Sequence, residues 1–395
     1  MRHLLKAAAF ALLAVPVVLV SGAGAANSHA SYRAVCPGPA FGAAACSSYV
    51  VTDSNGNPAA TSAPTGYGPA QFHGAYNLPL TGPAGQTIAI VDAYDDPTAK
   101  SDLDAYNSTY GLPPFPSCGG SVTTACFQKV DQRGGTTYPR KDAGWALEIA
   151  LDVETAHQIC QNCKILLVEA DSNSFANLGA AVNTAVALRA NVVSNSYGGS
   201  DSSATADYNH PGVAITASSG DNGYGVESPA SFNTVIAVGG TTLNLGANNS
   251  YGSESVWSGA GSGCSSLNTA QSWQTTTAGW AATACGTKRG VADVAADADP
   301  ASGASVYDTT RYQGQSGWFK VGGTSLSAPL IGAVYGLAGN AGSASYPASI
   351  PYAHTSSLHD ITSGSNGTCS TTMCKGGAGY DGPTGVGTPN GTGGF

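Results

Sequence analysis

Short apolar runs alternate with stretches of helical periodicity along most of the chain, beginning near Gly68. Two stretches, Ala143–Ile159 and Phe175–Leu188, repeat apolar residues every three to four positions and predict helices. The runs that predict strands are Thr87–Val91, Ile165–Val168, Val192–Ser196, Val213–Ala217 and Thr234–Val238. Strands separated by helices are typical of βαβ units, and wholly apolar strands are typical of sheets covered on both faces. We therefore predict an α/β fold with a doubly wound, mainly parallel sheet and helices on both faces.

The N-terminal residues depart from this pattern. Residues 1–25 have a basic start, an apolar run over Ala7–Val20 and a small-residue cleavage site, which are features of a signal peptide. The apolar run is shorter than the ~20 residues that cross a membrane. We therefore expect a secreted, extracellular protein with no membrane span after signal removal. Residues 26–66, rich in Ala, Gly, Ser and Pro, predict a short leader, and residues 67–395 predict the main domain, in which residues 241–288 are expected to form a loop-rich surface excursion.

Composition narrows the range of partners. The 395 residues include 15 Lys and Arg against 24 Asp and Glu, and charged residues make up only 10% of the chain. With a formal net charge of −9 and no basic patch to displace counterions, the chain is not expected to bind nucleic acid. A protein with few charged residues and an acidic balance is also suited to activity at low pH, where its carboxylates are neutral. We expect a monomer.

Ten cysteines fit an exported protein, because disulfides persist outside the cytosol. They fall into close sequence pairs at positions 36/46, 118/126, 160/163, 264/285 and 369/374, which favours local bridges, although spacing alone does not fix the connectivity. The pair Cys160 and Cys163 could also be a redox pair. This pair follows a predicted helix, whereas a redox pair is found at the start of a helix. A structural bridge is therefore the preferred interpretation.

A candidate nucleophile lies in the sequence GGTSLSAPL, residues 322–330. Pro329 and the apolar series after it indicate a helix that begins near Ser325, because proline is tolerated in a first turn. Unpaired backbone amides and the positive end of the helix dipole favour a developing oxyanion there. Ser325 is therefore a candidate, and it needs a base.

Carboxylates, more than histidines, supply candidates for that base. Glu148 and Asp152 are four residues apart on the predicted helix 143–159, so they share one face of an element that is apolar almost all round. Two buried acids held together repel, which raises at least one pKa and makes a better base. Glu154 lies off that face and is expected to point to water. Asp221 follows a predicted strand in Ser-Gly-Asp, and a protonated carboxyl there could donate to an oxyanion, although aspartate at such a place also caps turns.

These residues together resemble the sedolisins, the serine-carboxyl peptidases with a subtilisin-like fold. The matching segments are Glu148-x-x-x-Asp152, the run Ser218–Asp221, "RGVADVAADADP" at 289–300, and Gly323-Thr-Ser-x-Ser-x-Pro329, in the family's order. The resemblance implies an endopeptidase acting on proteins or peptides at acidic pH. It assigns Ser325 as nucleophile, Glu148 as base, Asp152 as the residue that orients Glu148, and Asp221 as oxyanion donor.

The C-terminal segment "HDITSGSNG…GGAGYDGPTGVGTP" resembles the family's calcium site. The resemblance implies one Ca²⁺ ion bound by the carboxylates of Asp360 and Asp381 and by the carbonyl groups of Ile361, Gly377 and Gly379. Calcium prefers oxygen ligands, and glycines allow the backbone to turn carbonyl groups inward. A glycine-rich terminal loop with incidental aspartates is the alternative interpretation.

Some features depart from the family. The leader is too short for the family's long prosegment, Tyr197 stands where many members have tryptophan, and Asp92, at the end of the first strand, stands where some have glutamate. One alternative is a subtilisin-type protease with a histidine base, but no His-Gly-Thr segment follows the first strand. The other is a secreted binding protein that kept the scaffold and lost catalysis.

Overall fold

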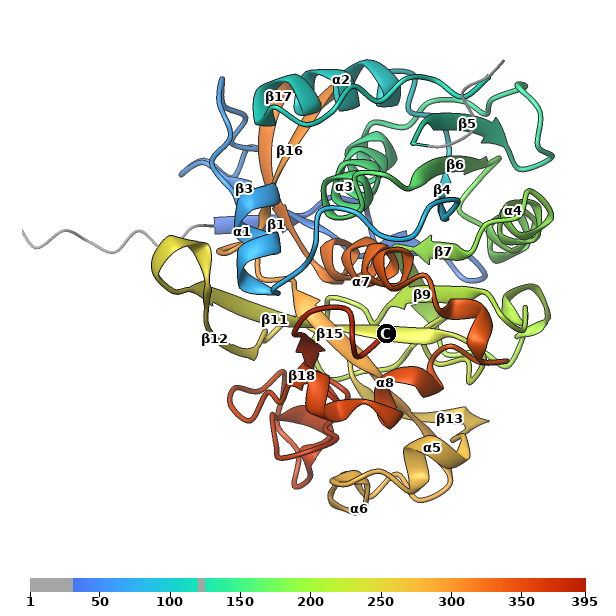
Figure 1. Cartoon of the computed structure of the whole chain (residues 1–395), viewed down its shortest axis with the longest axis vertical. Coiled ribbons are helices and arrows are strands. Elements are labelled where there is room, and N and C mark those ends of the chain that lie inside the picture. The colour runs from blue at the N-terminus through green and yellow to red at the C-terminus, as the bar shows by residue number, and fades with distance from the viewer. Residues whose placement is uncertain (1–30, 120–124) are drawn as a thin grey trace, which may run out of the picture.

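The computed structural model describes residues 31–119 and 125–395, so the signal-peptide prediction for residues 1–25 lies outside the described residues. A large sheet runs through the middle of the molecule in the order β12-β11-β9-β7-β4-β6-β5, with β15 paired to β11 (Figure 1). Its strands are β4 (Thr87–Ala93), β5 (Phe127–Asp131), β6 (Lys164–Ala170), β7 (Val192–Asn195), β9 (Ala214–Ser218), β11 (Ile236–Leu245), β12 (Tyr251–Val256) and β15 (Val294–Asp297). All the pairings are parallel except that of β12 with β11. The predicted doubly wound sheet is thus confirmed.

Helices cover both faces of this sheet. Helices α3 (Ala143–Ile159) and α7 (Thr324–Ala338) pack on one another and on the central strands, and α2 (Ala99–Tyr110) packs on α3. Helix α4 (Phe175–Ala187) packs on β4, β6 and β7 from the other side of the strands, away from α3 and α7 (Figure 1). Helix α3 has the bounds that periodicity predicts. Asp142 caps its start by accepting hydrogen bonds from the Gly144 and Trp145 amides.

The N-terminal segment pairs with two parts of the domain. A second, antiparallel sheet has the order β1-β3-β17-β16, with strands β1 (Ser31–Ala34), β3 (Tyr49–Thr52), β16 (Ala304–Tyr312) and β17 (Gln315–Gly322). Strand β2 (Ala45–Cys46) pairs with β8 (Tyr197–Ser200), which also pairs with β10 (Glu227–Ser228). Residues from the expected leader therefore pair with β8, which follows β7, and with β17, which precedes α7.

The remaining elements are short. They are α1 (Pro69–Ala75), α5 (Ser272–Thr275), α6 (Trp280–Thr283), α8 (Ser349–Ala353), β13 (Gly263–Thr269), β14 (Lys288–Val291), β18 (Leu358–His359) and β19 (Thr388–Pro389), with 3₁₀ turns at 206–208, 247–249, 341–343, 355–357 and 372–374. The expectation of a loop-rich excursion over 241–288 is partly wrong, because this stretch contains the end of β11 and all of β12 and β13. These strands are rich in Ser, Thr, Asn and Gly, so no apolar run marks them.

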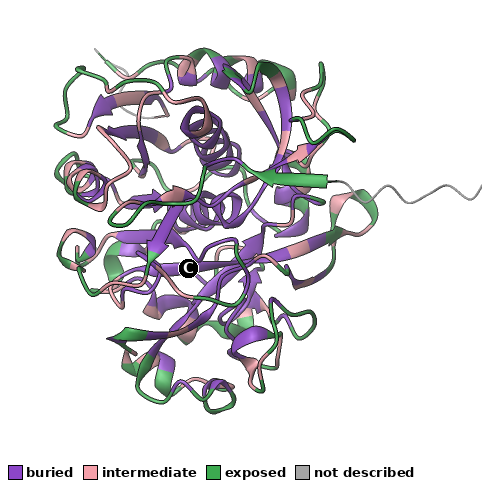
Figure 2. Ribbon diagram, turned by 180° about the vertical axis from the view of Figure 1, so that it is seen from behind, coloured by how far each residue is buried: buried purple, intermediate pink, exposed green. Residues whose placement is uncertain are grey.

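Burial follows the layers of the fold, with purple ribbon through the sheet and its inner helices (Figure 2). The prediction that Glu154 points to water is wrong, because it is only 2% exposed and accepts a hydrogen bond from the Tyr307 amide on β16. The antiparallel sheet covers this side of α3, which the periodicity of α3 alone does not reveal. Within the described ranges, no helix is long and apolar enough to cross a membrane.

All five close cysteine pairs form disulfides, and no cysteine of the described residues is free. Four of the bridges lie within the domain beyond residue 67. The fifth joins Cys36 to Cys46 inside the N-terminal segment. The local connectivity therefore leaves this segment unconnected by sulfur to the rest of the chain.

Candidate active site

Ser325 lies in the first turn of α7, directly after the end of β17. The turn between them needs Gly323, whose φ of 115° is a conformation that other residues rarely adopt. Ser325 is fully buried. Its hydroxyl donates to the Ser196 carbonyl at 3.1 Å, and its amide donates to the Ser47 carbonyl at 2.9 Å. The helix start thus presents both a hydroxyl and an amide N–H at one point.

Glu148 comes from the middle of α3, which packs against α7. Its side chain is fully buried and accepts a hydrogen bond from the Ser48 hydroxyl. Burial raises the pKa of Glu148 to about 7, while the neighbouring Ser325 and Ser48 hydroxyls favour the ionised form. A carboxylate with that pKa, in contact with a serine hydroxyl, can act as a general base.

Asp152 lies one helical turn beyond Glu148, and Asp92 reaches the same cluster from the end of β4. Both carboxyl groups are fully buried. Burial and repulsion from their acidic neighbours raise both pKa values well above the usual range, and the nearby Ser196 hydroxyl partly offsets this for Asp152. The cluster therefore keeps protons at pH values where exposed carboxylic acids have lost them. The pairing of Glu148 with Asp152 follows from their spacing, whereas the place of Asp92 follows only from the parallel sheet.

Asp221 follows β9 and faces the start of α7. Its Oδ1 atom accepts from the Thr324 amide and the Thr324 hydroxyl, both at 2.8 Å. Its Oδ2 atom is buried and has no hydrogen-bond partner within the described residues. Burial raises the pKa of Asp221 well above its usual value. Since Oδ1 already accepts two hydrogen bonds, the proton belongs on Oδ2, where it can be donated to another oxygen.

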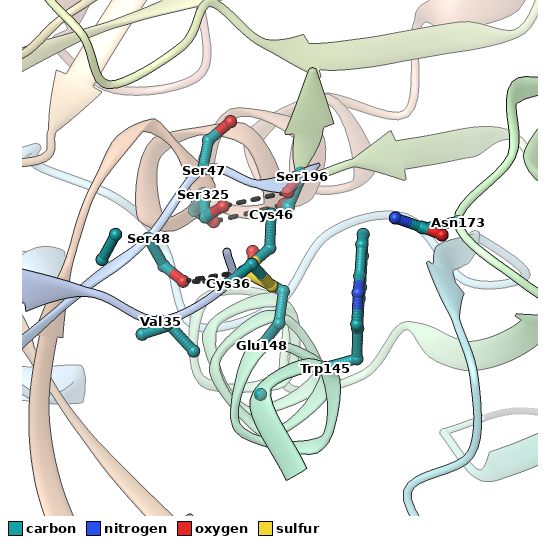
Figure 3. Close-up of a disulfide and its surroundings, with 12 residues drawn as sticks. Val35, Cys36, Cys46, Ser47, Ser48, Trp145, Glu148, Asn173, Ser196 and Ser325 are labelled. Atoms are coloured by element: carbon teal, nitrogen blue, oxygen red, sulfur yellow. Dashed lines mark hydrogen bonds between the residues drawn. A yellow bond between two sulfur atoms is a disulfide. The ribbon is translucent and has the colours of Figure 1, made fainter. Parts of the chain in front are cut away.

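The four candidates Glu148, Asp152, Asp221 and Ser325 thus come together at the carboxyl ends of the parallel strands. Sequence reasoning missed Ser47 and Ser48, which belong to the N-terminal segment and contact Ser325 and Glu148 (Figure 3). It also missed Thr324, which fixes Asp221. The only sequence signal for Thr324 is that it adjoins the nucleophile.

No histidine hydrogen-bonds to Ser325 in ranges 31–119 and 125–395. Backbone carbonyl groups bind His73, His210 and His354, and aromatic rings pack on His157 and His359. Burial lowers the pKa of His157 to about 3, which keeps this side chain neutral. The subtilisin-type alternative therefore lacks its base in this part of the chain.

The five residues of the candidate calcium site also lie in one region. Asp360 accepts from the Gly379 amide and Asp381 accepts from the Gly377 amide, both at 3.0 Å. Burial raises the pKa of Asp381 to about 8, and the Asp360 carboxylate adds to this shift. In the described ranges, the carbonyl oxygens of Ile361, Gly377 and Gly379 accept no hydrogen bond. Two neighbouring carboxylates with unpartnered carbonyl oxygens nearby are a donor set that suits a hard cation. No group of three or more His, Cys, Asp or Glu side chains with metal-binding geometry occurs there or elsewhere in the described residues.

Comparisons with known proteins agree with this geometry. A family model described as "Subtilase family" matches residues 121–361. Sedolisin of Pseudomonas sp. (strain 101) is 27% identical over 83% of this chain and 59% of its own length, and kumamolisin of Bacillus sp. (strain MN-32) is 31% identical over 84% and 63%. The chain thus spans about three fifths of these curated relatives. The structure of Pseudomonas sedolisin complexed with pseudo-iodotyrostatin has a TM-score of 0.65 and 26% identity, covering 83% of this chain and 96% of that one.

The fold and site define a subtilisin-like α/β protein in which a buried serine is paired with carboxylates. The chain belongs to the subtilase family and, within it, to the sedolisins.

Proposed function

We propose that this protein is a secreted serine-carboxyl endopeptidase that cleaves peptide bonds through an acyl-enzyme on Ser325. One observation carries the proposal. The Ser47 carbonyl oxygen accepts from the Ser325 amide, and both this oxygen and the unpartnered Oδ2 of Asp221 border the small space beside Gly323. Two donors beside a carbonyl form an oxyanion hole, and Glu148 supports Ser325 as the base.

The mechanism follows from these contacts. Glu148 takes the proton from the Ser325 hydroxyl as its oxygen attacks the substrate carbonyl carbon. The Ser325 amide and the protonated Asp221 carboxyl stabilise the negative oxygen of the tetrahedral intermediate. The protonated Glu148 then gives its proton to the leaving amine, and water repeats the sequence on the acyl-enzyme. Asp152 and Asp92 hold Glu148 among buried acids and tune its pKa.

The same roles imply an acidic working range. The reaction needs Glu148 ionised and Asp221 protonated, so activity falls as the pH rises through the pKa of Asp221. Removal of the N-terminal segment would admit water to the cleft and weaken the burial that raises the Glu148 pKa. We therefore expect an optimum on the acid side of neutrality for hydrolysis of added proteins.

Asp360, Asp381 and the carbonyl oxygens of Ile361, Gly377 and Gly379 would hold one Ca²⁺ ion. The ion would neutralise the two neighbouring carboxylates and tie the glycine-rich segment to the strand end at His359. In this role it supports the fold and takes no part in the reaction.

Digestion of casein at pH 3–5 by the purified protein tests the proposal, with mass mapping of the cut sites. Ser325→Ala and Glu148→Gln should each abolish cleavage, because one removes the nucleophile and the other cannot accept its proton. Glu154→Gln is the matched control. It changes a buried glutamate of the same helix that contacts β16, and it should leave cleavage intact. If the purified protein leaves casein uncut across this range, the catalytically silent binding protein becomes the better interpretation.

A further inference from the structure

We propose that four buried carboxyl groups between α2, α3 and β16 form a clasp that bound protons keep closed and that opens when they are lost. This carboxyl cluster consists of Asp96, Asp102, Glu154 and Asp308. Helices α2 and α3 both pack on β16 and on each other (Figure 1). The inference goes beyond the proposed peptidase activity, because it concerns how these elements are held together.

The four carboxyl groups come from four separate stretches of the chain. Asp96 follows β4, Asp102 lies in α2, Glu154 in α3 and Asp308 in β16. Each of these residues is at most 2% exposed. Within the described residues, no Lys, Arg or His side chain forms an ion pair with any of them. Acids that are buried together without a cation repel one another when they ionise.

The hydrogen bonds of the cluster attach both helices to an open sheet edge. Strand β16 is the last strand of the antiparallel sheet, so its outward amides have no neighbouring strand. Glu154 accepts from the Tyr307 amide at 3.0 Å, and Asp102 accepts from the Thr309 amide at 2.8 Å. Carboxyl groups of α3 and α2 thus cover the edge that another strand would otherwise pair with.

Three of the four carboxyl groups use only one of their oxygens. Oδ1 of Asp96 accepts from Thr98 and Thr310, Oδ1 of Asp308 accepts from the Thr310 amide, and Oε2 of Glu154 accepts from Tyr307. Their second oxygens are buried and have no partner in the described ranges. Asp102 differs, because both of its oxygens accept from Thr309.

This difference shows where protons belong. A buried carboxyl oxygen that accepts nothing can carry a hydrogen, and the resulting O–H can donate to a neighbouring carboxyl group. We therefore assign protons to Asp96, Glu154 and Asp308, and leave Asp102 as an acceptor. Burial, reinforced by the neighbouring acids, raises the pKa of Asp96 to about 6, that of Asp308 to about 8 and that of Glu154 well above its usual range.

The other titratable groups facing the cluster bring it no free positive charge. The Tyr106 and Tyr110 hydroxyls of α2 lie near Glu154. Lys129 of β5 donates to the Asp96 carbonyl oxygen, but its charge is paired with Asp95 and Glu169. The remaining groups are Glu169 of β6, which accepts from the Asp96 amide, and His157 of α3, which burial keeps neutral against Phe115.

The direction of the pH effect follows from these assignments. In an opened clasp the carboxyl groups meet water and ionise near pH 4. The closed clasp is therefore most stable below about pH 4, and it loses stability as the pH rises through about 6 and about 8. Each group that is protonated when closed and ionised when open raises the opening constant by up to about tenfold per pH unit.

Opening would loosen both sides of the candidate active site. Helix α3 carries Glu148 as well as Glu154, and β16 pairs with β17, which ends at Gly322 shortly before Ser325. The closed clasp thus holds the helix of the base to the hairpin that leads to the nucleophile. If the proposed function is correct, the clasp limits activity to acid by a route separate from Asp221.

Hydrogen–deuterium exchange of full-length Ser325→Ala, which cannot digest itself, tests the clasp. Peptides from α2 and β16 are followed from pH 4 to pH 9 at a fixed calcium concentration, and protection is corrected for the intrinsic pH dependence of exchange. We expect α2 and β16 to be protected at pH 4 and to lose protection between about pH 6 and pH 8. Strands β4, β6 and β7 should stay protected.

Two added substitutions in this background replace a titrating group with a neutral amide of the same shape. Glu154→Gln and Asp308→Asn each keep an oxygen for the β16 amide and place an N–H₂ group where the O–H was. Each should reduce the rise of the opening constant by up to about tenfold per pH unit, so that α2 stays protected to higher pH. Asp104→Asn is the matched control, because it makes the same change in α2 at a carboxyl that is 53% exposed. It should follow the parent protein.

Three outcomes would overturn the inference. Protection of α2 and β16 that stays constant from pH 4 to pH 9 would mean that no clasp opens. Loss of protection in β4, β6 and β7 at the same pH would be global unfolding. Identical profiles for Asp104→Asn and both cluster variants would mean that the cluster does not control opening. Each result leaves the peptidase proposal intact, because digestion of casein by the wild-type protein decides that proposal separately.

Discussion

At the scale of single residues, the two carboxyl oxygens of Asp221 have different surroundings. Oδ1 accepts from both donors of Thr324, and Oδ2 has no partner in the described part of the chain. An asparagine can reproduce this arrangement, with its carbonyl oxygen toward Thr324 and its amide N–H toward the substrate oxygen. An alanine can reproduce neither contact.

We therefore expect Asp221→Ala to lower kcat about 10²–10³-fold with little change in KM, as loss of an oxyanion donor does. Asp221→Asn should retain most of this activity. Burial raises the pKa of Asp221, so wild-type activity should fall as rising pH ionises the carboxyl and removes its proton. The Asn variant should lack this alkaline limb. Steady-state kinetics on one peptide across pH 3–9 would measure both effects, and equal losses in the two variants would contradict the role of Asp221 as a donor.

Residues of the site differ in how far the sequence predicts them. Glu148 and Asp152 can be predicted as a pair because a helix places positions four apart on one face. Asp92 joins them only because β4 lies beside β6 and β7 in the sheet, and these strands are far apart in the sequence. Ser47 and Ser48 are still harder to predict, because nothing in the sequence around them distinguishes them from other serines of the N-terminal segment.

At the scale of elements, the parallel sheet and its helices can be predicted because the sequence of each strand or helix has its own local apolar pattern. The antiparallel sheet cannot be predicted in this way, because β1, β3, β16 and β17 have neither a long apolar run nor a regular alternation, and they come from opposite ends of the chain. That sheet is also what buries Glu154 on the far side of α3. Local periodicity predicted that the helix is buried, but not which element covers each face.

A buried ion pair fixes the segment between β14 and β15 to β11. Arg289, 2% exposed, donates to both carboxyl oxygens of Asp293, and one of them also accepts from the Ala237 amide of β11 at 2.8 Å. Arg289→Met leaves the buried Asp293 carboxylate without its cation. We expect a loss of about 3–5 kcal/mol in the free energy of unfolding, measured by urea denaturation.

The matched control for this change is Arg133→Met. Arg133 binds Asp171 through two hydrogen bonds, but its side chain is 52% exposed. Removal of an exposed pair should cost no more than about 1 kcal/mol. Similar losses in the two variants would mean that burial of the Arg289 pair has no special role in joining these strands.

At the scale of the whole molecule, buried carboxyl groups recur well outside the site. Burial raises the pKa of Asp96 to about 6, of Asp308 to about 8 and of Glu169 to about 9, beside the value of about 7 for Glu148. In the unfolded chain such groups ionise near pH 4. The folded protein therefore binds more protons than the unfolded chain between about pH 4 and pH 9.

This difference has a definite sign. Because the folded state holds the extra protons, its free energy of unfolding falls as the pH rises through that window, by at most about 1.4 kcal/mol per pH unit for each such group. We expect Tm to be highest near pH 4 and to fall steadily toward pH 8, opposite to a protein stabilised by ionised carboxylates. Calorimetry of Ser325→Ala, which cannot digest itself, at a fixed calcium concentration would measure this, since bound calcium would otherwise add its own stabilisation. A Tm that rises from pH 4 to pH 7 would mean that the buried acids are ionised in the folded state. The assignment of Asp221 as a protonated oxyanion donor would then lose its support.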